Sequence, residues 1–563
     1  MRYIIFNFIF LISTSNAFAS QLIYNLLDGT ATVNHKSYSI HVNKYPFTNS
    51  YQYQINNKKS IHISGCRDEI KSFKIKIIVK KHLKDLTLVA KDSLPLENNI
   101  SLPSIDIRII KWWYQGAGSI HVKQHKVYLP ELLLKDSKLI KVDRLRQENY
   151  IRDTEMSGPN KYVLCSSKKS KELKNIRPLD ADVLQSVEVE TNKMQEYWIN
   201  IKIPRSIKAG IYHSYIYVKS NSTVVHKIPF SIEVYPFDLQ PSPLIYSIYY
   251  RGKLSLDGKP TIGSEYKSIE QYRAEILNMK EHGVLYPTNY VKYNQKLKQT
   301  LEIRKKLNLP TDYFFNLGIA IGNTKDSKEL VMLKKNIRLW IKLLRTYNYK
   351  NIYFYGIDEA EGNLLLSQKK VWQAVHDAGG KNFVATYNKK INSTIINMGS
   401  LLDAPVLAGK VKKQYADKWH SVGSKVFSYA NPQVGEENPD KYRRNFGLLL
   451  LQAGYDGTMN YAYQHAFGHI WNDFDHKKYR DHVFTYPTIN GVIDTIAWEG
   501  FREGTYDVRY AATLLDAISN SKNKALGEQA LYWYKRINFD KENLDYIRKK
   551  MIEFILKLKS IDN

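Results

Sequence analysis

The sequence predicts a multidomain fold, with an N-terminal antiparallel β-sandwich over residues 20–240 and a C-terminal (β/α)8 TIM-type barrel over residues 241–563. In the first part, short runs of Val, Ile, Tyr and Thr alternate with polar residues, which is the period of a half-buried strand. In the second part, apolar runs alternate with long amphipathic segments, as in a parallel barrel. The pattern changes at Pro241-Ser242-Pro243, which we take as the domain boundary.

The first part contains several strand candidates and few helical stretches. Turn residues such as Pro204 and Ala209-Gly210 separate the candidates. Frequent turns between alternating runs are typical of an antiparallel sandwich. The clearest strands are Phe73–Val79, Ile105–Trp113, Glu196–Ile203, Ile211–Val218 and Val224–Val234.

The second part contains eight strand–helix alternations. The expected strands are Leu244–Tyr250, Val284–Pro287, Tyr313–Ala320, Asn351–Ile357, Phe383–Tyr387, Pro405–Ala408, Lys425–Ala430 and Gly457–Tyr463. Each is a continuous apolar run, as expected of a strand buried on both faces. A doubly wound open sheet is the structural alternative. It would normally carry a Gly-rich nucleotide loop after its first strand, and Tyr249-Tyr250-Arg251-Gly252 is not one.

The N-terminus resembles an export signal. Met1-Arg2 precedes an apolar run from Tyr3 to Ile12, and Ala17-Phe18-Ala19 supplies a small-residue cleavage motif. The run is shorter than the roughly 20 residues that a membrane span requires, and no later segment approaches that length. We expect a signal peptide over residues 1–19, a secreted or periplasmic protein, and no stable membrane span after cleavage.

The chain is strongly basic, with a formal net charge of +29. A basic surface suits an anionic partner such as a sulfated or uronic polysaccharide, nucleic acid or anionic lipid. Lys, Asn, Ile and Tyr share AT-rich codons, however, and the positive charge is spread along the chain, so genome composition accounts for much of the excess. We expect a glycan partner, which can be anionic, and no nucleic acid.

Two cysteines and a histidine pair bear on redox and metal chemistry. Cys66 and Cys165 could form one disulfide or remain separate thiols, and their spacing leaves both open. His465 and His469 are four residues apart near Asp473, but they lie in a stretch that looks like a loop. We expect no metal and no cofactor.

Two adjacent carboxylates, Asp358 and Glu359, follow the fourth predicted barrel strand. In such barrels the catalytic groups sit at the C-terminal ends of strands. Repulsion and desolvation should raise the pKa of at least one carboxyl group, which suits an acid that protonates a glycosidic oxygen. The structural alternative is a solvated helix N-terminus, where acidic residues are common.

The mechanism depends on where the nucleophile comes from. Most retaining glycosidases place a second carboxylate about 5 Å from the acid. Glu436 and Glu437 could serve, but they lie in a loop beyond the seventh strand. Adjacent carboxylates instead favour substrate-assisted hydrolysis, in which the substrate's acetamido oxygen attacks the anomeric carbon.

Several motifs of the chain resemble glycoside hydrolase family 123. They are Tyr355-Gly-Ile-Asp-Glu359, Tyr442-Arg443, Leu451-Gln-Ala-Gly-Tyr-Asp-Gly457, Tyr486-Pro-Thr-Ile-Asn-Gly491, Ile496-Ala-Trp-Glu-Gly-Phe-Arg-Glu-Gly504 and Tyr506-Asp507, with Trp198–Pro204 and Ala209-Gly-Ile-Tyr212 in the N-terminal part. The resemblance implies a β-N-acetylgalactosaminidase type of activity, with a β-sandwich before the barrel. It also implies that Asp358 orients the acetamido group and that Glu359 is the general acid/base. Ala360 stands where the family often has Pro, and Ile357 where it often has an aromatic residue.

Further residues are candidates for binding the sugar, because aromatic faces stack on sugar rings and polar groups contact hydroxyls. The set comprises Arg251, Tyr387, Asn388, Tyr429, Tyr461, Tyr463 and Trp498. Barrel packing is the alternative for each aromatic residue, and Trp498 could instead brace the last helices. We therefore predict a glycoside hydrolase of the N-acetylhexosaminidase type. A two-carboxylate glycosidase acting on an anionic polysaccharide and a non-catalytic glycan-binding protein are the alternatives.

Overall fold

The computed structural model describes residues 30–34, 37–43, 47, 61–90, 104–118, 125–154, 162–169, 171–322 and 326–560, so the predicted signal peptide lies outside it. The chain forms two compact units: Met1–Ile110 with Asp182–Asp238, and Lys111–Ala181 with Leu239–Asn563. The later junction, between residues 238 and 239, falls close to the predicted boundary at residue 240. Residues 111–181, which the sequence prediction placed in the first domain, cluster instead with the second unit.

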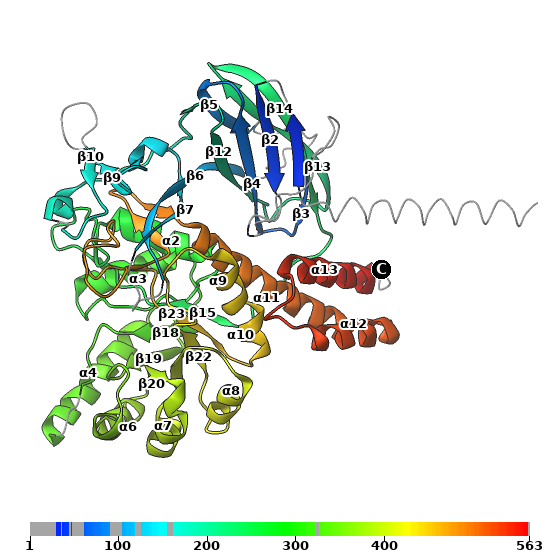
Figure 1. Cartoon of the computed structure of the whole chain (residues 1–563). Coiled ribbons are helices and arrows are strands. Elements are labelled where there is room, and N and C mark those ends of the chain that lie inside the picture. The colour runs from blue at the N-terminus through cyan, green and yellow to red at the C-terminus, as the bar shows by residue number, and fades with distance from the viewer. Residues whose placement is uncertain are drawn as a thin grey trace, which may run out of the picture. The chain divides into compact units, whose positions relative to one another are not determined.

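Two sheets form the first unit. The larger has the order β1 (Thr30–Asn34), β2 (Tyr38–Asn43), β4 (Ile70–Val79), β12 (Met194–Lys202), β6 (Ser104–Gly116) and β7 (Lys126–Leu134), with β7 and the end of β6 belonging to the second unit. The other has the order β11 (Val187–Val189), β5 (Leu83–Ala90), β13 (Gly210–Ser220), β14 (Thr223–Val234) and β3 (Ile61–Gly65). Phe73 and Ile199 of the larger sheet share one apolar cluster with Leu88 and Phe230 of the other. Figure 1 labels most strands of the two sheets.

A seven-stranded parallel sheet is the centre of the second unit. Its order is β15 (Ile245–Ile248), β23 (Gly457–Asn460), β22 (Phe427–Tyr429), β21 (Ala404–Ala408), β20 (Lys381–Tyr387), β19 (Asn351–Tyr355) and β18 (Tyr313–Asn316). The smaller sheets are β8 (Ile140–Asp143), β9 (Glu148–Arg152) and β10 (Tyr162–Leu164), and the pairs β16 (Lys253–Leu254) with β17 (Tyr266–Lys267), β24 (Gln464–His465) with β25 (His482–Val483), and β26 (Thr485–Pro487) with β27 (Val492–Asp494).

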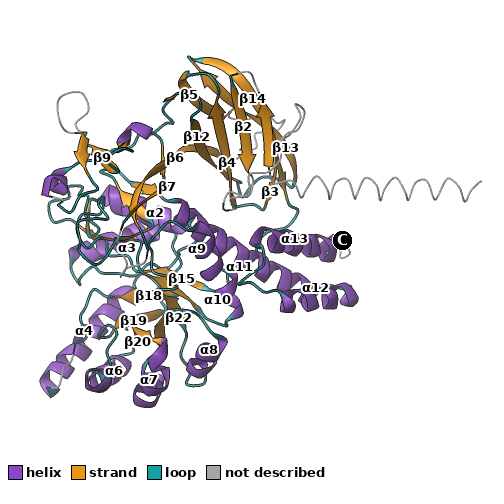
Figure 2. Cartoon of the chain, viewed as in Figure 1, coloured by secondary structure: helices purple, strands orange, loops and turns teal. Residues whose placement is uncertain are grey.

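Helices follow most strands of the parallel sheet and flank it (Figure 2). They are α2 (Ile269–Glu281), α3 (Gln295–Lys306), α4 (Ser327–Arg345), α5 (Gly362–Ser367), α6 (Lys369–Asp377), α7 (Ile391–Met398), α8 (Lys413–His420), α9 (Pro439–Asn445), α10 (Leu448–Gln452), α11 (Ile496–Asn520), α12 (Lys524–Arg536) and α13 (Leu544–Ser560). Short 3-10 helices are η1 (Ser137–Leu139), η2 (Lys171–Asn175), η3 (Asn388–Lys390) and η4 (Gly399–Leu401). No helix of the described residues is long and apolar enough to span a membrane.

The predicted second strand, Val284–Pro287, is not a strand in the structure. The backbone N–H groups of Tyr286 and Thr288 nevertheless donate to β15, over 3.1 and 3.2 Å, and that of Asn289 donates to Phe315 of β18 over 2.8 Å. Pro287 has no N–H, which limits regular pairing between these bonds. The segment 285–289 thus contacts both edge strands of the sheet by hydrogen bonds.

Both faces of the parallel sheet are buried, as its continuous apolar strands predict. One face packs against the helices in the largest apolar cluster. The other face carries an aromatic cluster that includes Phe315, Tyr353, Phe383 and Phe427. The Phe315 ring lies 5.3 Å from that of Phe383 and 5.4 Å from that of Phe427, centre to centre. The strand ends are therefore held on a rigid, closely packed base.

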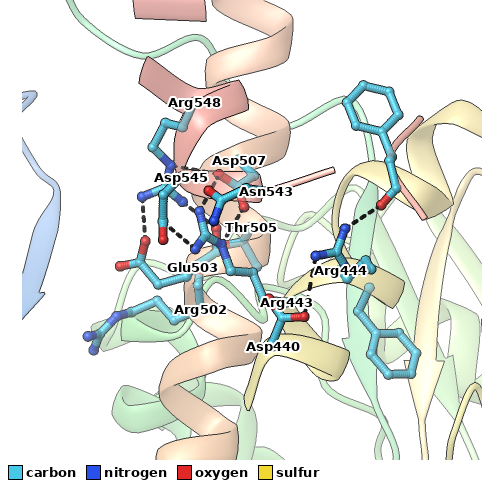
Figure 3. A network of polar contacts seen from close by, with 12 residues as sticks. Asp440, Arg443, Arg444, Arg502, Glu503, Thr505, Asp507, Asn543, Asp545 and Arg548 are labelled. Carbon is cyan, nitrogen blue, oxygen red and sulfur yellow. Dashed lines mark hydrogen bonds and ion pairs between the residues drawn. The ribbon is translucent and has the colours of Figure 1, made fainter. Parts of the chain in front are cut away.

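The C-terminal motif contributes a buried ion network, shown in Figure 3. Arg443 of α9 contacts Asp507 of α11 over 2.7 Å and Asp545 of α13 over 2.6 Å. Arg548 contacts the other oxygen of Asp507 over 2.6 Å and also pairs with Glu503. The network ties three helices together, so these motif residues have a structural explanation.

Cys66 and Cys165 are both buried and belong to different compact units. Cys165 carries a free thiol, so the two residues form no disulfide in the structure. Burial raises the pKa of the Cys165 thiol, which keeps it protonated and unreactive.

Candidate active site

The chain turns sharply at the C-terminal end of β19. Gly356 allows close packing there, because a Cβ at this position would lie 2.9 Å from the side-chain oxygen of Gln368. That oxygen accepts the N–H of Ile357 over 2.6 Å. Glu359 adopts a left-handed backbone with φ of 49°, and its N–H donates to Ala385 of β20 over 3.1 Å. The predicted carboxylates therefore sit on a fixed turn at a strand end.

Two phenols hold the carboxylate of Glu359. Tyr387, at the end of β20, donates to Oε2, and Tyr429, at the end of β22, donates to Oε1. The hydrogen bond to Glu359 is the main cause that raises the pKa of Tyr387 to about 12, and burial is the main cause that raises the pKa of Tyr429. Tyr387 is 40% exposed and Tyr429 only 5% exposed, so one phenol is open to solvent and the other is enclosed.

A separate pair of phenols lies beneath Asp358. Tyr355 donates to Oδ1 of Asp358, and Tyr249 donates to the Tyr355 oxygen over 3.1 Å. Burial raises the pKa of the Asp358 carboxyl group, the Tyr355 hydrogen bond opposes that rise, and the charge of Glu359 adds to it. The direction agrees with the expectation that at least one carboxyl of the pair has a raised pKa.

Arg251 and Tyr461 flank this group. An N–H of the Arg251 guanidinium donates to the Tyr461 phenol over 3.3 Å, while Arg251 is paired with Glu265. The Tyr461 ring lies 5.5 Å from the ring of Tyr249. Burial is the largest cause that raises the pKa of Tyr461, and the charge of Asp358 contributes. Both predicted residues therefore lie in the surroundings of the carboxylate pair.

The structure does not bring Tyr463 and Trp498 to this site. Both side chains are 0% exposed, and both donate to the side-chain oxygen of Asn278, over 3.1 and 2.9 Å. Trp498 also stacks on His282, with ring centres 4.7 Å apart. Both rings are enclosed in the core, which favours the packing alternative over sugar binding for these two residues. Asn388 begins η3, and its side chain lies outside the part that the structure describes.

Comparison with known proteins agrees with the sequence resemblance. Residues 117–220 match the family model described as the glycoside hydrolase 123 N-terminal domain. This match supports the resemblance of the chain to glycoside hydrolase family 123. The resemblance predicted from the motifs is thus confirmed, and the protein is a glycoside hydrolase.

A solved structure shows the same fold. The family 123 glycoside hydrolase from Clostridium perfringens, described for its glycolipid glycan hydrolysis, matches with a TM-score of 0.58 at 14% identity, covering 90% of this chain and 96% of its own. A family 39 glycoside hydrolase from Bacteroides cellulosilyticus reaches a TM-score of only 0.34 at 11% identity, covering 58% of this chain and 75% of its own, which carries no argument. No curated protein sequence matches the chain.

Sequence reasoning missed two phenols of this candidate site, Tyr249 and Tyr355. Both stand at the ends of strands, where the pattern predicted buried apolar positions. A usable signal was present, because Tyr353 and Tyr355 are two residues apart on β19 and belong to the same aromatic cluster. The last tyrosine of the series, Tyr355, ends the strand and therefore lies close to the carboxylates that follow it.

The other candidate nucleophiles of the glycosidase have different partners. Glu436 accepts the N–H of Gly118 over 2.7 Å. Burial raises the pKa of the Glu437 carboxyl group, and its electrostatic neighbours are Glu131 and Arg480. In the described residues, neither carboxylate forms a hydrogen bond or ion pair with Asp358 or Glu359. The loop after β22 thus engages residues 111–131 rather than the carboxylate pair.

One group of the described residues has metal-binding geometry. Ligand atoms of His282, Asp494 and Glu499 lie within 4.8 Å of one another, and all three residues are buried. Glu499 is already paired with Arg502, a positive charge that would oppose a cation. The group is therefore explained as a buried ion cluster. The backbone N–H of His469, which lies four residues after His465, donates to the Asp475 carboxylate over 2.7 Å.

Proposed function

We propose that this family 123 glycoside hydrolase is a retaining, substrate-assisted β-N-acetylhexosaminidase of the β-N-acetylgalactosaminidase type. The observation that carries the proposal is that each adjacent carboxylate has its own phenols, Tyr355 for Asp358, and Tyr387 with Tyr429 for Glu359. Two carboxylates with the same role would not need different hydrogen-bond donors. Different donors suit two carboxylates that have different roles in the reaction of one sugar.

In the proposed first step, Glu359 gives its proton to the glycosidic oxygen as the bond to the anomeric carbon breaks. The carbonyl oxygen of the substrate's acetamido group attacks the same carbon and closes an oxazolinium ring. Asp358 accepts the acetamido N–H and stabilises the positive charge that develops on the ring. Water then opens the ring, Glu359 takes a proton from that water, and the anomeric configuration is retained.

The contacts of the alternative nucleophiles support this route. A two-carboxylate mechanism needs a second carboxylate about 5 Å from the acid. Glu436 accepts a hydrogen bond from Gly118, and Glu437 interacts electrostatically with Glu131. These contacts do not support a role for either residue as the nucleophile. A substrate that supplies its own nucleophile needs no carboxylate from that loop.

The fold that we propose for the two units agrees with this chemistry. We infer that segment 285–289 closes the parallel sheet into a (β/α)8 barrel, because it donates hydrogen bonds to β15 and to β18. We also infer that the two sheets of the first unit form a β-sandwich around their shared apolar cluster. The carboxylate pair then lies at the C-terminal face of the barrel.

Hydrolysis of 4-nitrophenyl β-N-acetylgalactosaminide, with and without a thiazoline analogue of the oxazoline, tests the proposal. We expect hydrolysis that the analogue inhibits. We also expect Asp358→Asn to lose most turnover, with no glycosyl azide formed when azide is added. Hydrolysis only of sugars that lack the acetamido group, or azide rescue through a glycosyl azide, would overturn the proposal and favour the two-carboxylate route.

A further inference from the structure

The hydroxyl group of Tyr355 is fully engaged in hydrogen bonds. A phenol oxygen has one proton to donate and accepts up to two hydrogen bonds. It accepts from the Tyr249 hydroxyl over 3.1 Å and from the backbone N–H of Ala385 over 3.3 Å. Its own proton is therefore left for Asp358, which accepts it on Oδ1.

We propose that Tyr355, itself fixed by Tyr249, is a positioning residue that keeps Asp358 ionised and aimed at the substrate's acetamido group. This inference rests on the proposed function and names the groups that prepare Asp358 for its role. An ionised carboxylate can only accept hydrogen bonds, and it matches a donor that has no other acceptor. A protonated Asp358 could still accept from Tyr355 on its unprotonated oxygen, but that hydrogen bond would be weaker because the acceptor would no longer be charged.

Both phenols remain donors throughout the working pH range. Burial is the largest cause that raises the pKa of Tyr249 and of Tyr355, and the charge of Asp358 raises both further. Neither hydroxyl therefore ionises near neutral pH. The two hydroxyl groups therefore act as oriented hydrogen-bond donors and not as acids.

The surroundings of Asp358 explain why such support is needed. The titratable groups that interact with Asp358 are Glu359, Tyr355, Tyr249, Tyr290, Tyr387, Tyr429 and Tyr461. Burial and the negative charge of Glu359 both raise the pKa of Asp358, and the Tyr355 hydrogen bond is the cause that lowers it. Without that bond, Asp358 would become protonated at a higher pH. A neutral carboxyl stabilises the oxazolinium charge less well.

The two rings are packed, so the hydroxyl groups can be removed without removing the rings. The Tyr355 ring lies 4.9 Å from that of Phe383 and 6.1 Å from that of Tyr249, both edge to face. Phenylalanine at either position keeps these contacts. Tyr353 offers a control on the same strand, because it is a tyrosine of the same aromatic cluster, and in the described part of the chain its hydroxyl makes no hydrogen bond to Asp358.

The test compares Tyr355→Phe, Tyr249→Phe and the control Tyr353→Phe in the full-length protein. For Tyr355→Phe, we expect kcat on 4-nitrophenyl β-N-acetylgalactosaminide to fall roughly 10- to 100-fold, as for the loss of a hydrogen bond to a charged group. The acid limb of the kcat profile should move to higher pH. Tyr249→Phe should shift it in the same direction by less, and Tyr353→Phe should not shift it. In the Asp358→Asn background, Tyr355→Phe should add little.

A second measurement does not depend on the substrate. Carbon-13 NMR of the carboxyl groups, with Asp358 assigned by its loss in Asp358→Asn, follows the titration of Asp358 directly. Its pKa should be higher in Tyr355→Phe than in the wild type. An unchanged titration together with an unchanged acid limb would overturn the inference. A raised pKa in a protein that does not hydrolyse N-acetylated substrates would instead overturn the proposed function alone.

Discussion

The phenol of Tyr429 donates a hydrogen bond to Oε1 of Glu359, joining the end of β22 to the turn after β19. Because Tyr429 is enclosed, water cannot easily replace its hydroxyl group. We expect Tyr429→Phe to lower kcat by roughly 10- to 100-fold, as for the loss of a hydrogen bond to a charged group. Steady-state kinetics on an aryl β-N-acetylgalactosaminide measures the effect.

The second phenol on the same carboxylate serves as the comparison. Tyr387 is 40% exposed, so water can take the place of its hydroxyl group after Tyr387→Phe. The loss in kcat should be smaller than for Tyr429→Phe. A larger loss for Tyr387→Phe would contradict the idea that the enclosed phenol is the main support of Glu359.

The raised pKa of Asp358 predicts a gain in stability when its charge is removed. A carboxyl group whose pKa is higher in the folded than in the unfolded state stabilises the fold below its unfolded pKa. That contribution is lost as the pH rises through the folded pKa. Asp358→Asn should therefore be more stable than wild type at pH 7 and unfold at a higher temperature. The gain in unfolding free energy should be under about 1 kcal/mol, because the side chain is partly solvated. The difference should shrink toward pH 4.

An opposite sign is expected for Asp377, which serves as the control. The hydrogen bond from Lys334 is the main cause that lowers the pKa of Asp377. Its contribution is present above the unfolded pKa and is lost on acidification. Asp377→Asn should therefore not stabilise the protein at neutral pH. Thermal denaturation of both variants across pH decides the matter, and equal shifts of the same sign would count against the assignment.

The carboxylate pair could be predicted from the sequence, because it follows a strand whose apolar run is unambiguous. The position of neighbouring side chains was harder to predict where the expected strand is longer than the observed one. Tyr461 and Tyr463 were both placed on the eighth strand, but β23 ends at Asn460. Beyond that residue the alternation of a strand no longer applies. Tyr461 then lies beside Arg251, whereas Tyr463 turns into the core.

The C-terminal motif shows a second limit of sequence reasoning. The same residue type, Trp, serves both for packing between helices and for stacking on a sugar. Nothing in the spacing around Trp498 distinguishes them, and only the contacts with Asn278 and His282 do. The hydrogen bond between Tyr249 and Tyr355 could not be predicted either, because it joins strands that are far apart in the sequence.

The buried position of Trp498 predicts an effect on stability and not on substrate binding. Trp498→Phe keeps an aromatic ring but removes the hydrogen bond to Asn278. We expect a loss of about 1–2 kcal/mol in unfolding free energy, from the bond and the smaller ring. KM for the aryl substrate should stay within twofold of wild type. A several-fold rise in KM without a loss of stability would restore Trp498 as a sugar-binding residue.

The ion network of Figure 3 predicts a large effect from one neutral substitution. Asp507 lies between Arg443 and Arg548, and all three side chains are buried. Asp507→Asn leaves two buried guanidinium groups poorly compensated, so we expect a loss of about 3–5 kcal/mol in unfolding free energy. Chemical denaturation measures it. Asp417→Asn removes an exposed ion pair with Lys413 and should change stability by less than about 1 kcal/mol.

Two glycines inside α11 explain why this long helix can lie close to α9. A Cβ built at Gly500 would lie 2.3 Å from the backbone oxygen of Pro439, and one at Gly504 would lie 2.6 Å from that of Arg443. Both obstacles are backbone atoms, which cannot rotate away. The close approach of the helices therefore requires glycine at both positions.

Gly500→Ala weighs this close approach against helix propensity. Alanine favours a helix over glycine by about 1 kcal/mol. Overpacking of a well-filled core costs roughly 1–3 kcal/mol, and more where backbone must move. Because the obstacle is backbone, we expect overpacking to dominate and Gly500→Ala to lower the midpoint of chemical denaturation. In α12, a Cβ at Gly527 would lie at an ordinary 3.5 Å from Ile518, so Gly527→Ala should raise stability by up to about 1 kcal/mol. If both substitutions stabilised the protein, the close contact between α9 and α11 would be wrong.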